Sequence, residues 1–285
     1  MFYTGCPMWG YKEWVGNFFP VHTPQSDFLK LYSKKLTTVE GNTTFYAVPN
    51  ADTVSRWRDE TPATFRFCFK LPRSISHEPG LDKKQRETQA FIERMQLLGE
   101  RLGPYFLQLP PAFGPAHIDE LQAFLANWPT GLHLAVEVRH PDFYREPHND
   151  ELNALLAQHH VARVLMDTRP IRTGPAKEQQ VLQARERKPD LPLLVSAITD
   201  IAFVRYIGHP RTEINAPLLD EWAETLAGWL NSGMTLYVFC HCPFEVHSPQ
   251  ICKALYERVQ RLVRLPSLPW DSDSHDEHVE QGKLF

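Results

Sequence analysis

Charged side chains stand at or near the ends of several apolar runs in this sequence, among them Glu40, Lys70 and Glu137. Two carboxyl groups can divide the roles of general acid and general base when their surroundings separate their pKa values. A lysine can form a Schiff base or hold an anion. The same side chains also allow a structural network in which Arg139 and Lys70 neutralise the two glutamates. The sequence leaves these roles open.

Other polar and aromatic residues occupy comparable positions. His140 and Asp167 follow two further apolar runs and complete the candidate catalytic set. His140 precedes a proline, so a turn-capping role competes with catalysis. The candidate ligand-binding residues are Trp9, Tyr11, Asn42, Phe45, Tyr46, Gln108, Arg139 and Arg205. Their aromatic members could stack on a base or a sugar, and packing is the alternative.

The sequence contains no motif for a common cofactor. It has neither a GxGxxG turn after the first apolar run nor a Walker-type loop, so no nicotinamide, flavin or nucleotide-loop motif is present. Cys240, His241 and Cys242 have ligand chemistry, but on a strand His241 points away from both cysteines, and we expect no metal there. A divalent metal on the remaining acids and histidines has no spacing motif to support it: Glu137, His140, Asp167, His209 and His241.

Eight apolar runs rich in β-branched and aromatic residues predict buried strands. They span 2–5, 36–40, 65–70, 105–109, 134–138, 162–166, 201–207 and 235–240. Segments with helical spacing lie between them, at 25–35, 51–60, 82–102, 117–128, 149–160, 217–231 and 249–263. Eight units of about 33 residues predict an α/β fold, the closed TIM (β/α)8 barrel, with a doubly wound open sheet as the alternative. A barrel would bring the candidate residues together at its C-terminal mouth.

Charge divides the sequence into one domain and a tail. Residues 1–265 form the predicted barrel domain, with a basic insertion at 168–190 that holds six bases and three acids. Residues 266–285 form an acidic segment that we expect to be disordered, and its five acids and one base account for the net charge of −4. The first 265 residues are neutral, with 29 bases and 29 acids, so an anionic ligand at the mouth is not excluded.

The composition indicates a folded cytoplasmic protein. With 42% hydrophobic and 22% charged residues, the sequence is not that of a disordered chain, and no apolar stretch approaches the ~18–20 residues of a membrane span. The first residues lack the basic and apolar regions of a signal peptide. Five cysteines without framework spacing fit a reduced compartment. We therefore expect no membrane partner.

Seven stretches carry a family pattern: GCPMWGYKEWVGNFFP (5–20), TVEGNTTFYAVPN (38–50), FRFCFKLPRSISH (65–77), FLQLPPAFGP (106–115), AVEVRHPDFY (135–144), RVLMDTRP (163–170) and VRYIGH (204–209). Together they resemble the YecE-like family, domain of unknown function 72. The resemblance implies a TIM barrel and a recurring polar set that includes Glu40, Lys70, Glu137 and Arg205, but it implies no reaction. Many members have an Asn-Asn pair where this sequence has 240–242, so no role is carried over to that position.

The last five residues carry a second resemblance. Gln281, Leu284 and Phe285 are similar to the QLxLF-type peptide by which bacterial proteins bind the replication sliding clamp, with Gly282 in place of leucine. Such peptides place glutamine in a polar site and a Leu-Phe pair in an apolar pocket. The resemblance predicts the sliding clamp as a partner of the tail.

Three functional hypotheses follow. The first is an enzyme, a hydrolase of phosphodiester or sugar phosphate bonds, that acts at the barrel mouth on an anionic small molecule or a nucleic acid. The second is a sugar-directed hydrolase or isomerase. The third is a non-catalytic adaptor that the tail recruits to the sliding clamp.

Overall fold

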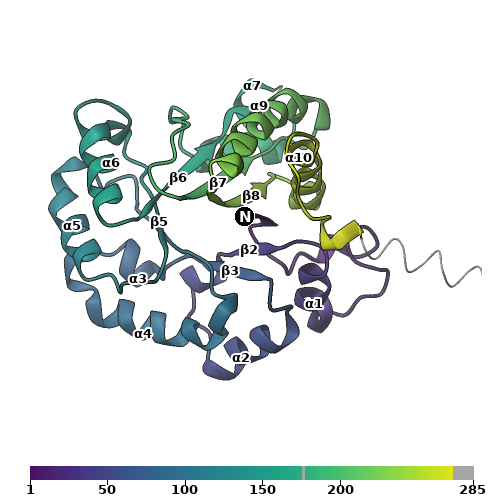
Figure 1. Ribbon diagram of the computed structural model, residues 1–285, viewed down its shortest axis with the longest axis horizontal. Coiled ribbons are helices and arrows are strands. Elements are labelled where there is room, and N and C mark those ends of the chain that lie inside the picture. The colour runs from purple at the N-terminus through teal and green to yellow at the C-terminus, as the bar shows by residue number, and fades with distance from the viewer. Residues whose placement is uncertain (175–176, 272–285) are drawn as a thin grey trace, which may run out of the picture.

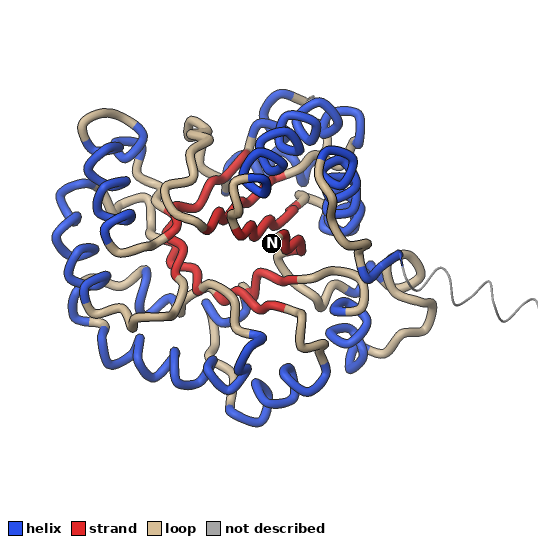
Figure 2. Tube along the Cα trace, viewed as in Figure 1, coloured by secondary structure: helices blue, strands red, loops and turns tan. Residues whose placement is uncertain are grey.

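Eight parallel strands form a nearly closed barrel in the computed structural model, which describes residues 1–174 and 177–271 (Figures 1 and 2). The strands are β1 Phe2–Cys6, β2 Thr38–Gly41, β3 Arg66–Phe69, β4 Tyr105–Gln108, β5 Leu134–Glu137, β6 Ala162–Asp167, β7 Ile201–Ile207 and β8 Thr235–His241. Each begins and ends within two residues of a predicted run, because these runs are buried on both faces. The predicted α/β barrel is confirmed.

Helices follow the strands around the outside of the barrel (Figure 1). They are α1 Phe28–Ser33, α2 Ala51–Glu60, α3 Arg73–Ser76, α4 Gln85–Met95, α5 Ile118–Ala126, α6 His148–Gln158, α7 Arg169–Thr173, α8 Gln179–Arg187, α9 Thr212–Asn231 and α10 Ser248–Leu262. Helix α2 shows the local logic, since the Asn50 side chain caps the amide of Thr53 while Val54 and Trp57 face the core. No helix in the described ranges has both the length and the apolar character needed to cross a membrane.

The strands pair in the order β3-β2-β1-β8-β7-β6-β5-β4. Between β3 and β4 there are only two isolated bridges, Phe67 with Leu102 and Lys70 with Phe106, in place of a continuous ladder. Two backbone hydrogen bonds cross this seam, from Leu71 N to the Phe106 carbonyl at 2.9 Å and from Gly103 N to the Phe67 carbonyl at 2.8 Å. The barrel therefore closes with one weak joint, a feature that the sequence pattern does not reveal.

Side chains that point into the barrel form an apolar layer below a polar one. In the lower layer Phe203 stacks on Phe106 and packs at a tilt against Phe239. Because side chains alternate along a strand, the next inward position on β2, β4, β7 and β8 comes two residues after the apolar layer, at the C-terminal mouth. Polar residues occupy these positions, so the strand period itself gathers the candidate site.

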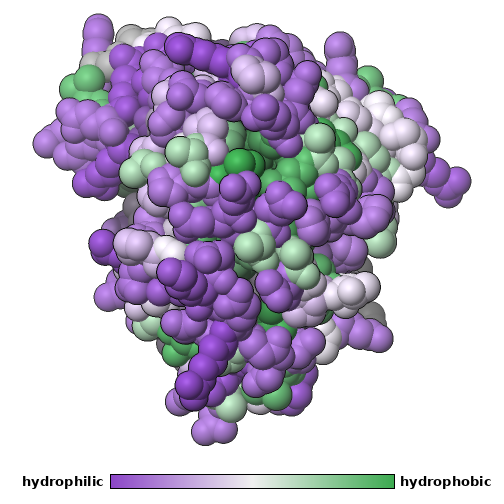
Figure 3. Space-filling model, turned by 90° about the vertical axis from the view of Figure 1, so that its left-hand side faces the viewer, coloured by the Kyte–Doolittle hydropathy of each residue, from purple (hydrophilic) through white to green (hydrophobic). Residues whose placement is uncertain are grey.

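The outer faces of α5 and α6 are mainly hydrophilic, with hydrophobic side chains in the recesses between them (Figure 3).

The two atypical segments of the sequence differ in their contacts. The basic insertion contains α7 and α8. The first residues of the predicted tail are packed against the barrel, because Leu268 is buried, Trp270 lies edge-on to Phe18, and Asp271 binds Lys253 at 2.6 Å. Ordered contacts thus continue past 265, at least to Asp271.

Candidate functional site

A buried guanidinium lies at the centre of the mouth. Arg205 on β7 donates from Nε and Nη2 to the two carboxylate oxygens of Glu40 on β2, both at 2.8 Å. Its Nη1 donates to Glu137 Oε2 on β5 at 2.6 Å. All three side chains are at most 4% exposed, and the guanidinium also lies 4.9 Å above the Phe106 ring. One arginine thus holds two carboxylates from different strands.

Further polar side chains surround this triad. Arg139 donates from Nε to Glu137 Oε1 at 2.6 Å and from Nη2 to the Gln108 side-chain oxygen at 2.8 Å. Asn42 donates to Glu40 Oε1 at 2.7 Å. His241 Nε2 lies 3.3 Å from Glu40 Oε2. The structure therefore brings together six of the sequence-predicted residues (Glu40, Asn42, Gln108, Glu137, Arg139 and Arg205) and adds His241.

Both carboxylates are ionised. Burial alone would raise the pKa of Glu137, but Arg139 and Arg205 lower it to about 2. The pKa of Glu40 is likewise held well below its ordinary value by Arg205 and His241 against the effect of burial. Burial lowers the pKa of His241 to about 4, so its neutral ring donates from Nε2 to the carboxylate. The predicted general-acid role does not fit either glutamate, because neither holds a proton near neutral pH.

Lys70 lies beside this network without joining it. Its Nζ is 3.8 Å from the centre of the Phe45 ring, and the residue is 8% exposed. Within the described ranges no carboxylate lies at ion-pair distance from this ammonium group. Burial, together with the charge of Arg205, lowers the pKa of Lys70 to about 7. His77, edge-on to Phe45, has its pKa lowered to about 4 by burial and by Lys70.

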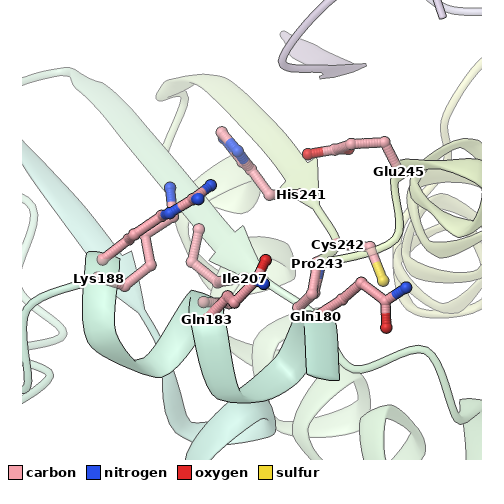
Figure 4. Close-up of a pocket in the computed structure, with 10 residues that line it drawn as sticks. Gln180, Gln183, Lys188, Ile207, His241, Cys242, Pro243 and Glu245 are labelled. Carbon is pink, nitrogen blue, oxygen red and sulfur yellow. The ribbon is translucent and has the colours of Figure 1, made fainter. Parts of the chain in front are cut away.

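A cavity of about 180 Å³ opens between α8 and the end of β8. Its polar lining comes from Gln180, Gln183, Arg187 and Lys188 on one side and from His241 and Glu245 on the other. In Figure 4 the carboxyl group of Glu245 points toward the ring of His241. The basic insertion therefore supplies one wall of the mouth.

Two titratable groups in this cavity have shifted pKa values. Burial and the charge of Arg205 lower the pKa of Lys188 to about 8. Burial raises the pKa of Glu245 to about 7, although Ser248 donates a 2.5 Å hydrogen bond to its Oε2. Among described residues Glu245 has no cation at ion-pair distance. An acid and a base that both titrate near neutral pH thus lie beside one cavity.

Two predicted catalytic residues, Asp167 and His140, make other contacts. On β6 the inward positions belong to Val164 and Met166, so Asp167 points outward and accepts hydrogen bonds from Trp222 Nε1 at 2.8 Å and from Arg169. The structure does not bring Asp167 to the mouth network. His140 accepts from the Asp142 amide at 3.3 Å, the turn-capping contact that competes with catalysis.

The aromatic candidates fall into two groups. Trp9 packs edge-on against Trp57 and Phe67, and Tyr11 packs against Trp14, so these two serve the core and its edge. Phe45 and Tyr46 contact each other beside Lys70, and Tyr46 is 83% exposed. Only the second pair is placed to meet a ligand at Lys70.

Sequence reasoning missed three residues of the mouth. Glu245 comes four residues after β8, so extending the strand-end rule into the following loop would have found it. His77 follows α3 at a position with no regular spacing from β3. Lys188 lies 21 residues beyond the end of β6, and only the fold of the insertion returns it to the mouth.

The sequence also raised a metal site and a partner-binding tail. In residues 1–174 and 177–271 no group of three or more His, Cys, Asp or Glu side chains could hold a metal ion. As predicted, Cys240 and His241 point to opposite sides, His241 into the barrel and Cys240 into the surrounding core. Gln281, Leu284 and Phe285 lie outside the described residues, so clamp binding stays a prediction.

Comparisons with known proteins identify the family. The family model described as protein of unknown function DUF72 matches residues 3–273. The UPF0759 protein YecE of Escherichia coli K12 is 34% identical over 95% of this chain and 99% of its own length, and the UPF0759 protein YunF of Bacillus subtilis is 30% identical over 40% and 41%.

Solved structures show the same fold. A DUF72 family protein from Enterococcus faecalis V583 has a TM-score of 0.70 at 16% identity, covering 94% of this chain and 97% of its own. Another from Thermotoga maritima has a TM-score of 0.66 at 22% identity, covering 92% and 99%. The chain belongs to the family of proteins of unknown function DUF72.

Proposed function

We propose that this chain is an enzyme whose site is the barrel mouth and whose ligand is a small molecule bearing a phosphate group, such as a sugar phosphate. The observation that carries the proposal is the excess of positive charge. Glu40 and Glu137 are both paired with arginines, so Arg187 and Lys188 in the cavity lining add positive charge, and Lys70 adds the charge of its protonated fraction. Cations in a recessed site attract anions and raise their local concentration.

The arrangement suggests a role for each group. Arg205 is fully occupied by two carboxylates, so it positions the network. Lys188 and Arg187 line the cavity and are suited to bind a phosphate, while the amides of Gln180 and Gln183 can bind hydroxyl groups. Glu245, with a pKa near 7, is the best-placed group for proton transfer. The cavity volume of about 180 Å³ favours a small ligand over a nucleic acid.

Ligand-induced stabilisation tests the proposal. Because a ligand that binds only the folded state raises its Tm, ribose 5-phosphate should raise the Tm of the full chain while ribose should not. Lys188→Gln should lose at least half of this shift. Lys30→Gln, an exposed substitution on α1, should keep it. Abasic, nicked and flapped DNA are tested in the same assay. If DNA alone raises the Tm, the ligand is a nucleic acid and not a small molecule. No shift with any of these anions contradicts the proposal.

The sugar-directed hydrolase is less favoured by the geometry. A glycosidase needs one protonated and one ionised carboxyl group across the bond that breaks. Here both candidate carboxylates bind one guanidinium and are ionised. An isomerase that moves protons with Glu245 remains compatible with the proposal.

A further inference from the structure

The surroundings of Lys70 at the mouth do not suit a permanent charge. It is buried beside Arg205 and Arg139, both positively charged, whereas the neighbouring carboxylates Glu137 and Glu40 are already held by those arginines. The ammonium group of Lys70 contacts the face of the Phe45 ring. A ring face supports a cation less strongly than a carboxylate does when the site is dry.

A lysine in such a place has a neutral fraction that surface lysines lack. With a pKa of about 7, close to half of its molecules carry a free amine at pH 7. For an ordinary lysine with a pKa of about 10.4, the neutral fraction at pH 7 is roughly 1 in 2,500. Desolvation and neighbouring cations are the means by which proteins activate lysine nucleophiles.

We propose that Lys70 forms an imine with the carbonyl carbon of an anionic aldehyde or ketone bound at the mouth. The inference deepens the proposed function and rests on it, because the phosphate or carboxylate of the same ligand is the group that Lys188 and Arg187 would bind. It narrows the substrate class to carbonyl compounds that carry a negative charge. Sugar phosphates in their open-chain form belong to this class.

The step balances without a further reactant. The Nζ lone pair attacks the carbonyl carbon, a C–N bond forms, and the C=O π pair moves to oxygen, which takes up a proton. The resulting carbinolamine loses its hydroxyl group as water and becomes a C=N imine, whose protonated form withdraws electrons from the adjacent carbon. No oxidation state changes in the protein, and hydrolysis reverses the step.

Borohydride trapping tests the imine in the intact chain. Glyoxylate and pyridoxal 5′-phosphate, one small and one larger anionic aldehyde, are each added at one equivalent at pH 7, followed by sodium borohydride, which reduces an imine to a stable amine. Peptide mass mapping then locates the label. We expect Lys70 to be labelled at least about tenfold more than the exposed Lys30 and Lys34, given its neutral fraction. Inorganic phosphate should protect Lys70, and pyridoxal without phosphate should label it less.

The pH profile and one matched variant complete the test. Labelling of Lys70 should level off above about pH 8, while labelling of free N-acetyl-lysine, added as a reference, should keep rising. The charged and titratable groups near Lys70 are Arg205, Arg139, Glu137, Glu40 and His77. Lys70→Arg keeps a positive charge but has no reactive amine, so it should lose the label at position 70, while the low labelling of Lys30 and Lys34 should stay the same.

Each result decides something. If neither aldehyde labels Lys70 above Lys34 while ribose 5-phosphate still raises the Tm, Lys70 acts only as an anion clamp and the imine is overturned. If the Tm shift is absent as well, the proposed function itself fails. Selective labelling that inorganic phosphate does not reduce would contradict the claim that the ligand's anion is held at the same site.

Discussion

At the scale of single residues, the mouth is organised by one arginine. The strand period predicted that Glu40, Glu137 and Arg205 would face one opening, and this much is confirmed. The sequence could not show which charges pair, because side-chain reach across a barrel decides it. Because each glutamate pairs with this guanidinium, both carboxylates are ionised and neither can act as a proton donor.

Removing that arginine should leave two buried carboxylates short of a partner. We expect Arg205→Met to lower the free energy of unfolding by roughly 3–5 kcal/mol, as for other buried pairs that lose one member. Urea denaturation at pH 7 measures it. Arg56→Met, which removes an exposed arginine, should change little. The triple variant Arg205→Met, Glu40→Gln and Glu137→Gln should recover part of the loss, and a triple variant no more stable than the single one would contradict this account.

Lys70 should leave a signature in the pH dependence of stability. Its pKa is about 7 in the folded chain and about 10.4 in the unfolded chain, so between these values the unfolded state binds more protons. The stability of the native chain relative to Lys70→Met should therefore rise with pH from about 7 to 10, with a slope of at most about 1.4 kcal/mol per pH unit. Denaturation curves at several pH values measure the difference. A flat difference would show that Lys70 keeps an ordinary pKa, and a falling one that its pKa is raised in the folded chain.

At the scale of elements, the basic insertion uses part of its charge to fold. Arg185 on α8 donates to the backbone carbonyls of Ile171, Arg172 and Gly174, and Arg172 donates to the carbonyl of Lys188. A basic composition in 168–190 is compatible with a solvated helix or with a phosphate-binding patch. The contacts show a third use, in which guanidinium groups bind backbone carbonyls and fix α8 to α7.

These arginine–carbonyl hydrogen bonds between α7 and α8, called the clasp below, predict a local effect of substitution. Arg185→Met removes three donors to backbone carbonyls, so hydrogen exchange in 179–188 should become at least about tenfold faster, whereas exchange in β7 and β8 should stay the same. Because α8 carries Lys188, the Tm shift with ribose 5-phosphate should shrink as well. Arg86→Met, on α4 and away from the insertion, is the matched control. Unchanged exchange in 179–188 would mean that the clasp does not hold α8.

At the scale of the whole molecule, the apolar runs of the sequence predicted the barrel but not the weak pairing of β3 with β4 that closes it. Eight runs predicted eight strands because burial on both faces leaves a strong local pattern. The seam between β3 and β4, by contrast, depends on how closely two backbones approach, which no periodicity records. The same limit applies to the mouth, where Lys188 and His77 arrive through loops whose paths are set by tertiary contacts.

Gly103 tests how the seam is held. Its amide donates across the seam to the Phe67 carbonyl, and a Cβ at this position would lie 2.9 Å from Cys68 Sγ and 3.1 Å from the Phe67 oxygen. Gly103→Ala should therefore push β3 and β4 apart and cost roughly 1–3 kcal/mol of stability in urea denaturation. Adding Cys68→Ala relieves only the sulfur contact, so it should not restore the crossing hydrogen bond.

The control for the seam is another glycine-to-alanine change with the opposite expected sign. Gly228 lies on an exposed turn of α9, where an added Cβ meets nothing within 4 Å. Gly228→Ala should stabilise the chain by up to about 1 kcal/mol through helix propensity. Hydrogen exchange at the Gly103 and Leu71 amides should speed up in the first variant alone, because these amides make the two hydrogen bonds that cross the seam. If Gly103→Ala were as stable as the native chain, the two strands would have room to separate without loss, and the seam would be a flexible joint of the barrel.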